Sequence, residues 1–207
     1  LTRATRGISY ERNLLGFKTT TFSGLSDFGY DDFSFPVLSS GFDLEKTFFR
    51  KLLVKAGFIY SSSVDWGLVR SDNLTDKSGN SITYLSGKYS PIRSIRTGLE
   101  LALSHYSASG DNPMLPGIAG KIDVNYRSRI LSVHGNVARY EKKFRSLTAF
   151  SANDRQEMLL SVQTSPIRSL NLTTSYKQMF NSLNNGKRRI TEHLPSFNAR
   201  YMLSKNT

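Results

Sequence analysis

Residues 95–104 read IRTGLELALS, and this stretch decides the fold class. Its odd-numbered positions are apolar apart from one threonine, whereas its even-numbered positions are charged or small. A β-strand directs successive side chains to opposite faces, while a helix with about 3.6 residues per turn would mix the two sets. The stretch therefore predicts a strand with one apolar face and one polar face.

The same alternation recurs along the chain and predicts about ten antiparallel strands. The aromatic and acidic segment 23–40 interrupts it, and we interpret this segment as an ordered loop, with a misread pair of strands as the alternative. The predicted strands cover residues 8–20, 41–48, 52–66, 81–89, 95–106, 118–127, 130–140, 157–164, 170–180 and 196–203.

The predicted connections alternate between tight basic turns and long polar stretches. Turns are expected near residues 49–51, 90–94, 127–129, 165–169 and 204–207, with long connections at 69–80, 107–117, 141–155 and 181–195. The turn sequence SPIRS occurs twice, at 90–94 and at 165–169, with four predicted strands between the copies. An even number of intervening strands places both copies on the same rim of an antiparallel sheet.

The net charge of +12 first suggests a nucleic-acid partner. The basic residues, however, are scattered over predicted turns and polar strand faces and form neither a basic helix nor an aromatic platform. We therefore exclude nucleic acid. The sequence contains no cysteine, so disulfides and cysteine-based metal sites are excluded as well.

Two architectures can bury such a meander: a soluble sandwich with its apolar faces inside, or a closed barrel with its apolar face in lipid. Aromatic residues near the predicted strand ends favour the barrel, because aromatic rings gather at membrane–water boundaries. They are Tyr60, Trp66, Tyr84, Tyr89, Tyr106, Tyr126, Tyr140, Tyr176, Phe180, Phe197 and Tyr201.

These patterns resemble those of bacterial outer-membrane β-barrels as a class, over most of the chain from Leu52 onward. The resemblance implies an all-β, up-and-down transmembrane barrel or part of one, a single domain over residues 1–207, located in the bacterial outer membrane. Barrels of this class usually end in an aromatic residue, whereas this sequence ends in Thr207. We therefore expect further strands beyond residue 207, as in a large secretion translocon or an usher.

The alternation assigns individual residues to the two faces of the expected barrel. The predicted lumen-lining residues are Arg96, Glu100, Lys121, Asp123, Arg127, Lys177 and Arg200. The predicted lipid-facing residues are Leu99, Leu101, Leu103, Val124, Val133, Leu160 and Leu172. Arginine is accordingly expected to be poorly tolerated at Leu101 and better tolerated at Ser104.

The lumen charges have two interpretations: pairs that stabilise a wet interior, or an electropositive lining that favours anionic solutes or acidic polypeptides. The basic run Lys187, Arg188 and Arg189 is a solvated loop tip in one interpretation and a contact for lipopolysaccharide phosphates in the other.

No catalytic, cofactor or metal site is expected, since the three histidines are isolated and no nucleophile motif occurs. The leading hypothesis is a non-enzymatic channel or translocation pore whose partners are membrane lipid and lipopolysaccharide. The alternatives are a structural barrel wall with other subunits of a secretion or surface-assembly complex, and a soluble β-rich binding module with a basic surface.

Overall fold

The computed structural model describes residues 6–30, 33–63, 79–107, 116–144, 154–167, 169–181 and 191–202. They form one antiparallel sheet of eleven strands. In the described residues, no helix has the length and hydropathy needed to span a bilayer. The strands are β1 (Arg6–Leu14), β2 (Phe17–Tyr30), β3 (Phe33–Phe48), β4 (Leu52–Ser63), β5 (Gly79–Ile92), β6 (Ile95–Ser107), β7 (Gly117–Arg127), β8 (Leu131–Tyr140), β9 (Arg155–Ile167), β10 (Leu170–Asn181) and β11 (Thr191–Tyr201).

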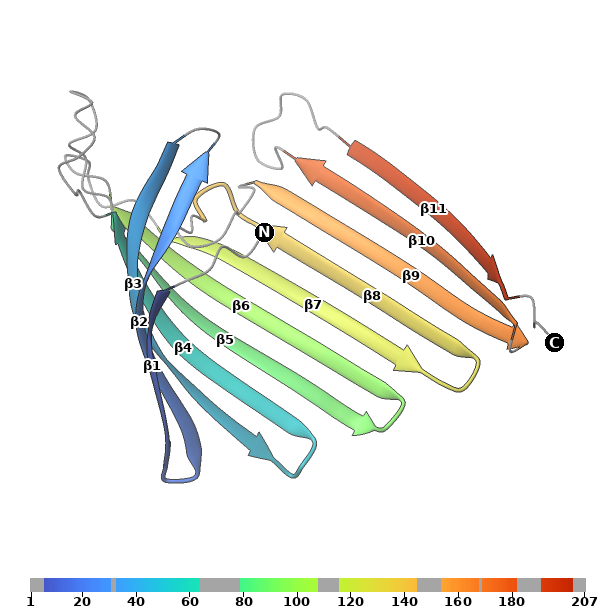
Figure 1. The fold of residues 1–207 in the computed structure, drawn as a ribbon, viewed down its shortest axis with the longest axis horizontal. Helices are drawn as coiled ribbons and strands as arrows, with labels where there is room; N and C mark the ends of the chain where they lie inside the picture. Colours follow the sequence, from blue (N-terminus) through green and yellow to red (C-terminus); the bar gives the residue numbers. More distant parts are fainter. Residues whose placement is uncertain are drawn as a thin grey trace.

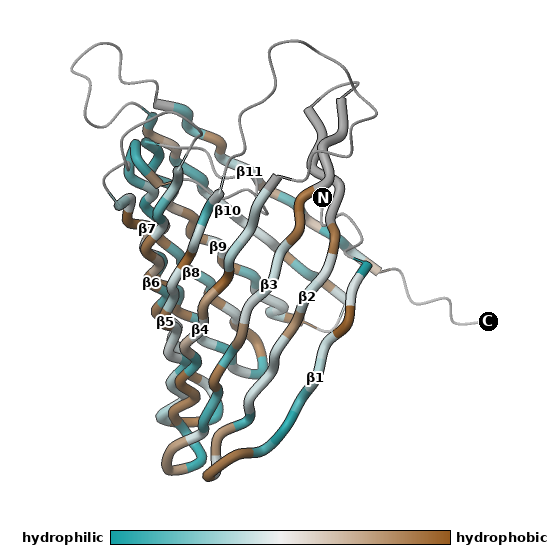
Figure 2. The backbone as a smooth tube through the Cα atoms, turned by 90° about the vertical axis from the view of Figure 1, so that its left-hand side faces the viewer, coloured by the Kyte–Doolittle hydropathy of each residue, from teal (hydrophilic) through white to brown (hydrophobic). Residues whose placement is uncertain are grey.

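Each strand pairs with its neighbours in sequence, so the sheet is an uninterrupted meander from β1 to β11. Within the described part of the chain, β1 and β11 do not contact each other, and the sheet is open. It is strongly curled: β4 to β11 fan across the view of Figure 1, while β1 to β3 turn away from them at one side. The side view of Figure 2 shows the resulting trough.

Tight turns join β1 to β2, β3 to β4, β5 to β6 and β7 to β8 on one rim of the sheet, the tight-turn rim. In the first turn Leu15 and Gly16 have φ of 50° and 78°, and in the second Phe49 and Arg50 have φ of 51° and 55°. Positive φ at both central residues is the signature of turns whose twist matches that of the flanking strands. The long connections predicted for the opposite rim lie mostly outside the described residues.

The N-terminal third of the prediction is wrong in two places. The predicted strand 8–20 is a hairpin, because Leu15 and Gly16 make a two-residue turn inside it. The segment 23–40, interpreted as a loop, belongs to β2 and β3, which stay in register up to the pair Tyr30 and Phe33. The polar residues that mark the other turns are missing from Leu15–Gly16, so the sequence pattern shows no break there.

The repeated SPIRS sequence marks the same structural irregularity twice on the tight-turn rim. The strands continue through Ile92 and Ile167, beyond the predicted ends. The pairing register of β5 with β6 shifts next to Pro91, and that of β9 with β10 shifts next to Pro166. Proline has no amide hydrogen to donate to the ladder, so an interruption there is expected. Four strands, β6 to β9, separate the two turns, as predicted.

The described residues form a single layer without an extensive apolar core. Large apolar side chains are exposed instead, among them Leu99 (45%), Leu101 (46%) and Leu103 (43%). A soluble sandwich would bury these side chains between two sheets. The buried apolar residues of the described part are Val37, Ile82, Ala119, Ala138 and Phe144.

Glycines on the two faces of the sheet should respond differently to substitution. A Cβ at Gly57 would collide with the carboxylate of Asp43 and the ring of Tyr84, whereas a Cβ at Gly87 would meet no atom within 4 Å. We expect Gly57→Val to destabilise the fold by about 1–3 kcal/mol through overpacking. Gly87→Val should be neutral or slightly stabilising, since valine favours strands. Urea unfolding of both variants in detergent micelles measures the difference, and equal effects would contradict the crowding described here.

Candidate functional site: the polar face of the sheet

The strand register divides the sheet into a polar face and an apolar face, because directly paired residues point to the same side. Glu100 pairs with Ser86 on β5 and with Lys121 on β7, and the same alternation can be followed through all eleven strands. The polar face carries the predicted lumen-lining set, Arg96, Glu100, Lys121, Asp123, Arg127, Lys177 and Arg200. The apolar face carries the predicted lipid-facing set, Leu99, Leu101, Leu103, Val124, Val133, Leu160 and Leu172.

The register thus places the two predicted sets on opposite faces, but contact of either face with water or lipid stays a prediction. The polar face is the more crowded one. A Cβ at Gly98 on this face would collide with Asp123, whereas at Gly120 and Gly135 on the apolar face the nearest atoms lie at 3.4 and 3.9 Å. Side chains converge on the inside of a curved sheet and diverge on its outside. The polar face is therefore the concave face of the trough in Figure 2.

A first polar cluster joins β3, β4 and β5. The Nζ of Lys55 lies 2.8 Å from Oδ2 of Asp43, and the hydroxyl of Tyr84 donates a hydrogen bond to Oδ1 of the same carboxylate. The Asp43 side chain is only 15% exposed, so it needs these partners. Gly57 leaves the space in which the three side chains meet.

A second polar cluster lies on β7 and β8. Asn125 donates from Nδ2 to Asp123 Oδ2 at 3.2 Å, and its Oδ1 lies 2.6 Å from Nδ1 of His134. Nε2 of His134 lies 3.2 Å from Nδ2 of Asn136. Each of these hydrogen bonds joins a donor to an acceptor when His134 carries its proton on Nδ1. The cluster joins two strands through side chains as well as through the backbone ladder.

A third cluster joins β9 and β10 through charges of opposite sign. Oε1 of Glu157 lies 2.8 Å from Nε of Arg155, and Oε2 lies 3.2 Å from Nζ of Lys177. Lys177, predicted to line a lumen, is therefore compensated by a carboxylate. Hydroxyl pairs continue the polar face toward both edges of the sheet, with Ser39 and Ser61 at 3.0 Å and Ser175 and Ser196 at 2.7 Å.

The charges on the polar face nearly balance, so the net charge of +12 is concentrated elsewhere. In the strand segments whose side chains are described, the cations of this face are Lys18, Lys55, Lys88, Arg96, Lys121, Arg127, Arg155, Lys177 and Arg200. The carboxylates of the same face are Glu11, Asp43, Glu45, Glu100, Asp123, Glu157 and Glu192.

Sequence reasoning missed a band of small buried residues across the polar face of β3 to β8, toward the end away from the tight turns. Ser104, for which the sequence predicts tolerance of arginine, belongs to this band and is only 1% exposed. A Cβ at Gly117 would collide with the backbone at Phe144, which folds over the band. The alternation of small residues in β6 and β7 was the available signal. The band consists of Ser39, Ser61, Asn80, Ser104, Gly117, Ala119 and Ala138.

The aromatic residues expected at membrane boundaries are divided between the two faces. Tyr84, Tyr106 and Tyr140 lie on the polar face, on the side opposite the predicted lipid-facing set. The others in the described part lie on the apolar face: Tyr60, Tyr89, Tyr126, Tyr176, Phe180, Phe197 and Tyr201. Trp66 and the basic run Lys187, Arg188 and Arg189 lie outside the described residues.

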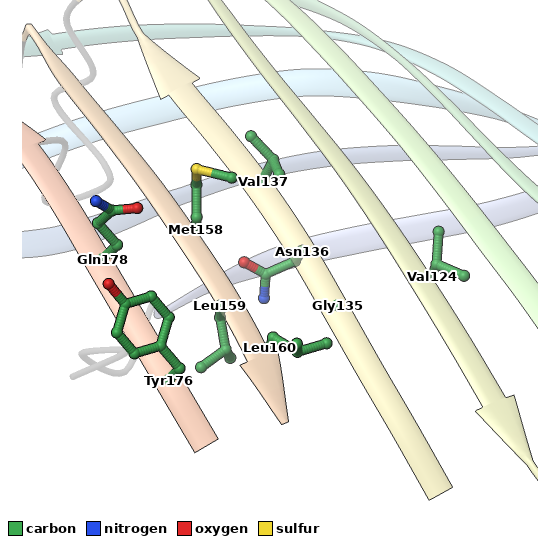
Figure 3. A pocket seen from close by; sticks show the side chains of 9 residues that line it. All are labelled: Val124, Gly135, Asn136, Val137, Met158, Leu159, Leu160, Tyr176 and Gln178. Carbon is green, nitrogen blue, oxygen red and sulfur yellow. The ribbon is translucent and has the colours of Figure 1, made fainter. Parts of the chain in front are cut away.

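A hollow of about 350 Å³ on the sheet is lined mainly by apolar residues of β7 to β10 around Gly135 (Figure 3). The absent side chain of Gly135 leaves it open between Val124, Leu160 and Tyr176. It opens on the apolar face, so it is not part of the polar site. Among the described residues, no group of three carboxylate or histidine side chains is arranged to hold a metal ion.

No family model matches the sequence, and no curated protein matches it. The fold, however, is similar to that of solved outer-membrane proteins. OmpT of Vibrio cholerae, folded in vitro, superimposes with a TM-score of 0.57 at 12% identity, over 94% of this chain and 63% of OmpT. The trimer form of the same protein gives a TM-score of 0.54 at 12% identity, over 93% of this chain and 61% of that one. The chain therefore has the fold of bacterial outer-membrane β-barrels.

The chain spans about three fifths of the length of the OmpT structures that it matches. A third structure is the KdgM porin in complex with disordered oligogalacturonate. Its superposition covers 98% of this chain and 94% of the porin, with a TM-score of 0.41 and 8% identity. This last similarity is too weak to support an argument.

The partly buried ion pair of the first cluster should matter more for stability than an exposed one. We expect Lys55→Met to destabilise the fold by about 1–3 kcal/mol, since it removes the charged partner of a largely buried carboxylate. Lys18→Met breaks the pair of Lys18 with Glu11, whose side chains are 47% and 56% exposed, and should destabilise the fold less than Lys55→Met because solvent screens the pair. Urea unfolding midpoints in the same detergent test this order. A larger loss for Lys18→Met would overturn it.

Proposed function

We propose that this chain forms part of the wall of a transmembrane β-barrel in the bacterial outer membrane, and that the barrel is a non-enzymatic channel or translocation pore. One observation carries the proposal: the face rich in leucine, isoleucine and valine is the convex, exposed face of a single-layer sheet. Burial of such a surface contributes about 25 cal/mol for each Å² removed from water. Hydrocarbon around the convex face provides that burial without a second layer of protein.

The dimensions of the apolar face suit a membrane. On β6 the apolar-face residues from Ile95 to Leu103 cover eight residue steps, which corresponds to about 27 Å along the strand. At a tilt of about 40° this becomes about 20 Å along the membrane normal, close to the apolar band of about 25 Å in barrels of this class. The strand lengths thus support a transmembrane arrangement.

The two free edges support a larger assembly. The hydrocarbon core contains no water to satisfy unpaired backbone groups, so a spanning sheet has to close. Among the described residues, β1 and β11 each have one side without a strand partner. We infer that strands outside these 207 residues complete the wall between β1 and β11. On this basis the concave polar face is one side of an aqueous lumen.

The charge distribution favours a weakly selective lumen over a strongly anion-selective one. Cations and carboxylates alternate along the polar face, and several are paired, as in the Asp43 and Glu157 clusters. Paired charges produce little net field at a distance. The surplus of cations is small, so we expect a modest preference for anionic solutes.

Two other functions remain as rivals. A structural wall of a secretion or surface-assembly complex would have the same barrel, with its lumen filled by a partner. A soluble binding module with a basic surface would need a dry core, and the single layer of the described residues has none. Heat-modifiable migration of the purified protein distinguishes a barrel from a soluble module. Conductance in planar bilayers then distinguishes an open pore from a filled one.

The assignment of the convex face to lipid has a direct test on β6. We expect Leu101→Arg to reduce membrane insertion, since a cation near the centre of the bilayer costs about 2–4 kcal/mol. Glu100→Arg, on the adjacent polar-face position, should insert normally. The fraction of protein that shows heat-modifiable migration after refolding into vesicles measures both. Equal insertion of the two variants would contradict the assignment of the convex face to lipid.

The proposed lumen has a test by ion selectivity. Neutralising Lys88 and Lys121 together, as Lys88→Gln and Lys121→Gln, should shift the reversal potential in a salt gradient toward cation preference. Arg139→Gln, on the apolar face, should leave it unchanged. If the reversal potential did not change in the Lys88→Gln, Lys121→Gln variant, this face would not line the pore.

A further inference from the structure

The charged side chains on the apolar face are of one sign, whereas the polar face carries both signs. Arg6, Arg12, Lys46 and Arg139 lie on the apolar face by register. In the strand segments whose side chains the structure describes, no carboxylate shares that face with them. The positive charge on this side of the sheet is therefore not balanced locally.

These four cations lie at two levels along the strands. Arg12 and Lys46 each precede a tight-turn residue, Leu15 or Phe49, by three positions. Arg6 and Arg139 lie nine positions from the nearest tight turn. The positions of the same face that lie between these two levels are mainly apolar. Long basic side chains at the ends of such a band can extend their charged groups to the membrane surface.

At the level near the tight turns, Lys46 lies between two aromatic rings. Its Nζ is 4.4 Å from the ring centroid of Phe17 and 5.5 Å from that of Phe48. Two further cations, Arg50 and Lys51, follow in the turn between β3 and β4. Within the described part of the chain, none of Arg12, Lys46, Arg50 and Lys51 forms an ion pair with a carboxylate.

The two turns beside these cations present apolar side chains at their tips. Leu15 is 88% exposed and Phe49 is 91% exposed. Leu15, Phe49 and Arg50 occupy the left-handed region of φ, which costs a non-glycine residue free energy. Exposed, strained and apolar turn residues next to cations are unexpected on a rim surrounded only by water.

This combination identifies the partner by its chemistry. A soluble anion would be attracted by the cations alone and would gain no favourable contact with exposed leucine and phenylalanine. The boundary of a bilayer offers both environments, with phosphates at one depth and acyl chains just below, and aromatic rings prefer this depth. Each basic residue near an anionic leaflet adds measurably to binding.

We propose that Arg12, Lys46, Arg50 and Lys51, together with Leu15, Phe17, Phe48 and Phe49, form a site for the phosphate headgroup of an anionic phospholipid on the outside of the barrel at the tight-turn rim. We call this set the rim anchor. The inference rests on the proposed membrane location, and it adds a specific lipid class and a specific sector, β1 to β4, to that function.

The test compares the full chain in phosphatidylcholine vesicles prepared with and without phosphatidylglycerol. Heat-modifiable migration reports insertion, and native mass spectrometry of the extracted protein reports retained phosphatidylglycerol. We expect wild type to retain phosphatidylglycerol in preference to phosphatidylcholine. The double variant Arg50→Gln with Lys51→Gln should weaken that retention about thirtyfold at unchanged insertion, from the typical contribution of two basic residues.

The matched control is Arg93→Gln with Arg129→Gln, which removes the same charge from other turns of the same rim. It should keep most of the retention. A single Lys46→Gln variant, which leaves both turns intact, should also lose retention, and unchanged retention would overturn the inclusion of Lys46 in the rim anchor.

Failure of this inference differs from failure of the proposed function. Absence of insertion in every lipid would overturn the membrane location itself. Insertion without preference for phosphatidylglycerol, or equal losses for the two double variants, would overturn the rim anchor and leave the barrel intact. Competition by inorganic phosphate as effective as that by phosphatidylglycerol would show a site for free anions instead, and would also overturn it.

Discussion

Hydrogen bonding between neighbouring strands holds this molecule together, because the described part has no dry core to do so. Each interior strand is bonded on both sides, and the ladder runs without a crossover from β1 to β11. Such a ladder satisfies the backbone everywhere except at its edges. The stability of the sheet therefore depends on what covers the two edges and the convex face. The proposed closed wall in hydrocarbon would meet both requirements.

The polar face adds side-chain bonds to this ladder. Three clusters bridge adjacent strands on the concave side, around Asp43, around His134 and around Glu157. Curvature brings these side chains together, and glycine at positions such as 57 provides the space. The same convergence that crowds this face spreads the side chains on the other. Bulky aliphatic residues on the outside and small or paired polar residues on the inside follow from a single geometric cause.

The distribution of charge has a corresponding division. On the concave face, cations and carboxylates occur together, and several compensate one another. On the convex face of the described strands, the charged residues are all basic, and they lie at the two ends of the apolar part of that face. The excess positive charge of the chain thus belongs in part to the outside and to the tight turns. In the proposed arrangement, the basic composition that first suggested nucleic acid instead serves a boundary between hydrocarbon and phosphate.

Local alternation in the sequence determined the all-β class, the antiparallel meander, the positions of most strands from Leu52 onward, and the face on which each of Arg96, Leu101, Lys121 and Leu160 lies. These features follow from the two-residue repeat of a β-strand, which can be recognised within a few residues of sequence. The turn at Leu15 and Gly16 did not show in the pattern, because two apolar or small residues leave the alternation unbroken.

Only the tertiary structure decided which side of the sheet is concave, and therefore that Ser104 is buried and Leu101 exposed. It also decided which charges meet, since Asp43, Lys55 and Tyr84 come from three strands, and it placed Lys46 between Phe17 and Phe48. The register of pairing sets these contacts, and register depends on turns and curvature that act across tens of residues. A periodic sequence specifies which face a side chain occupies, but not which residues of other strands it will touch.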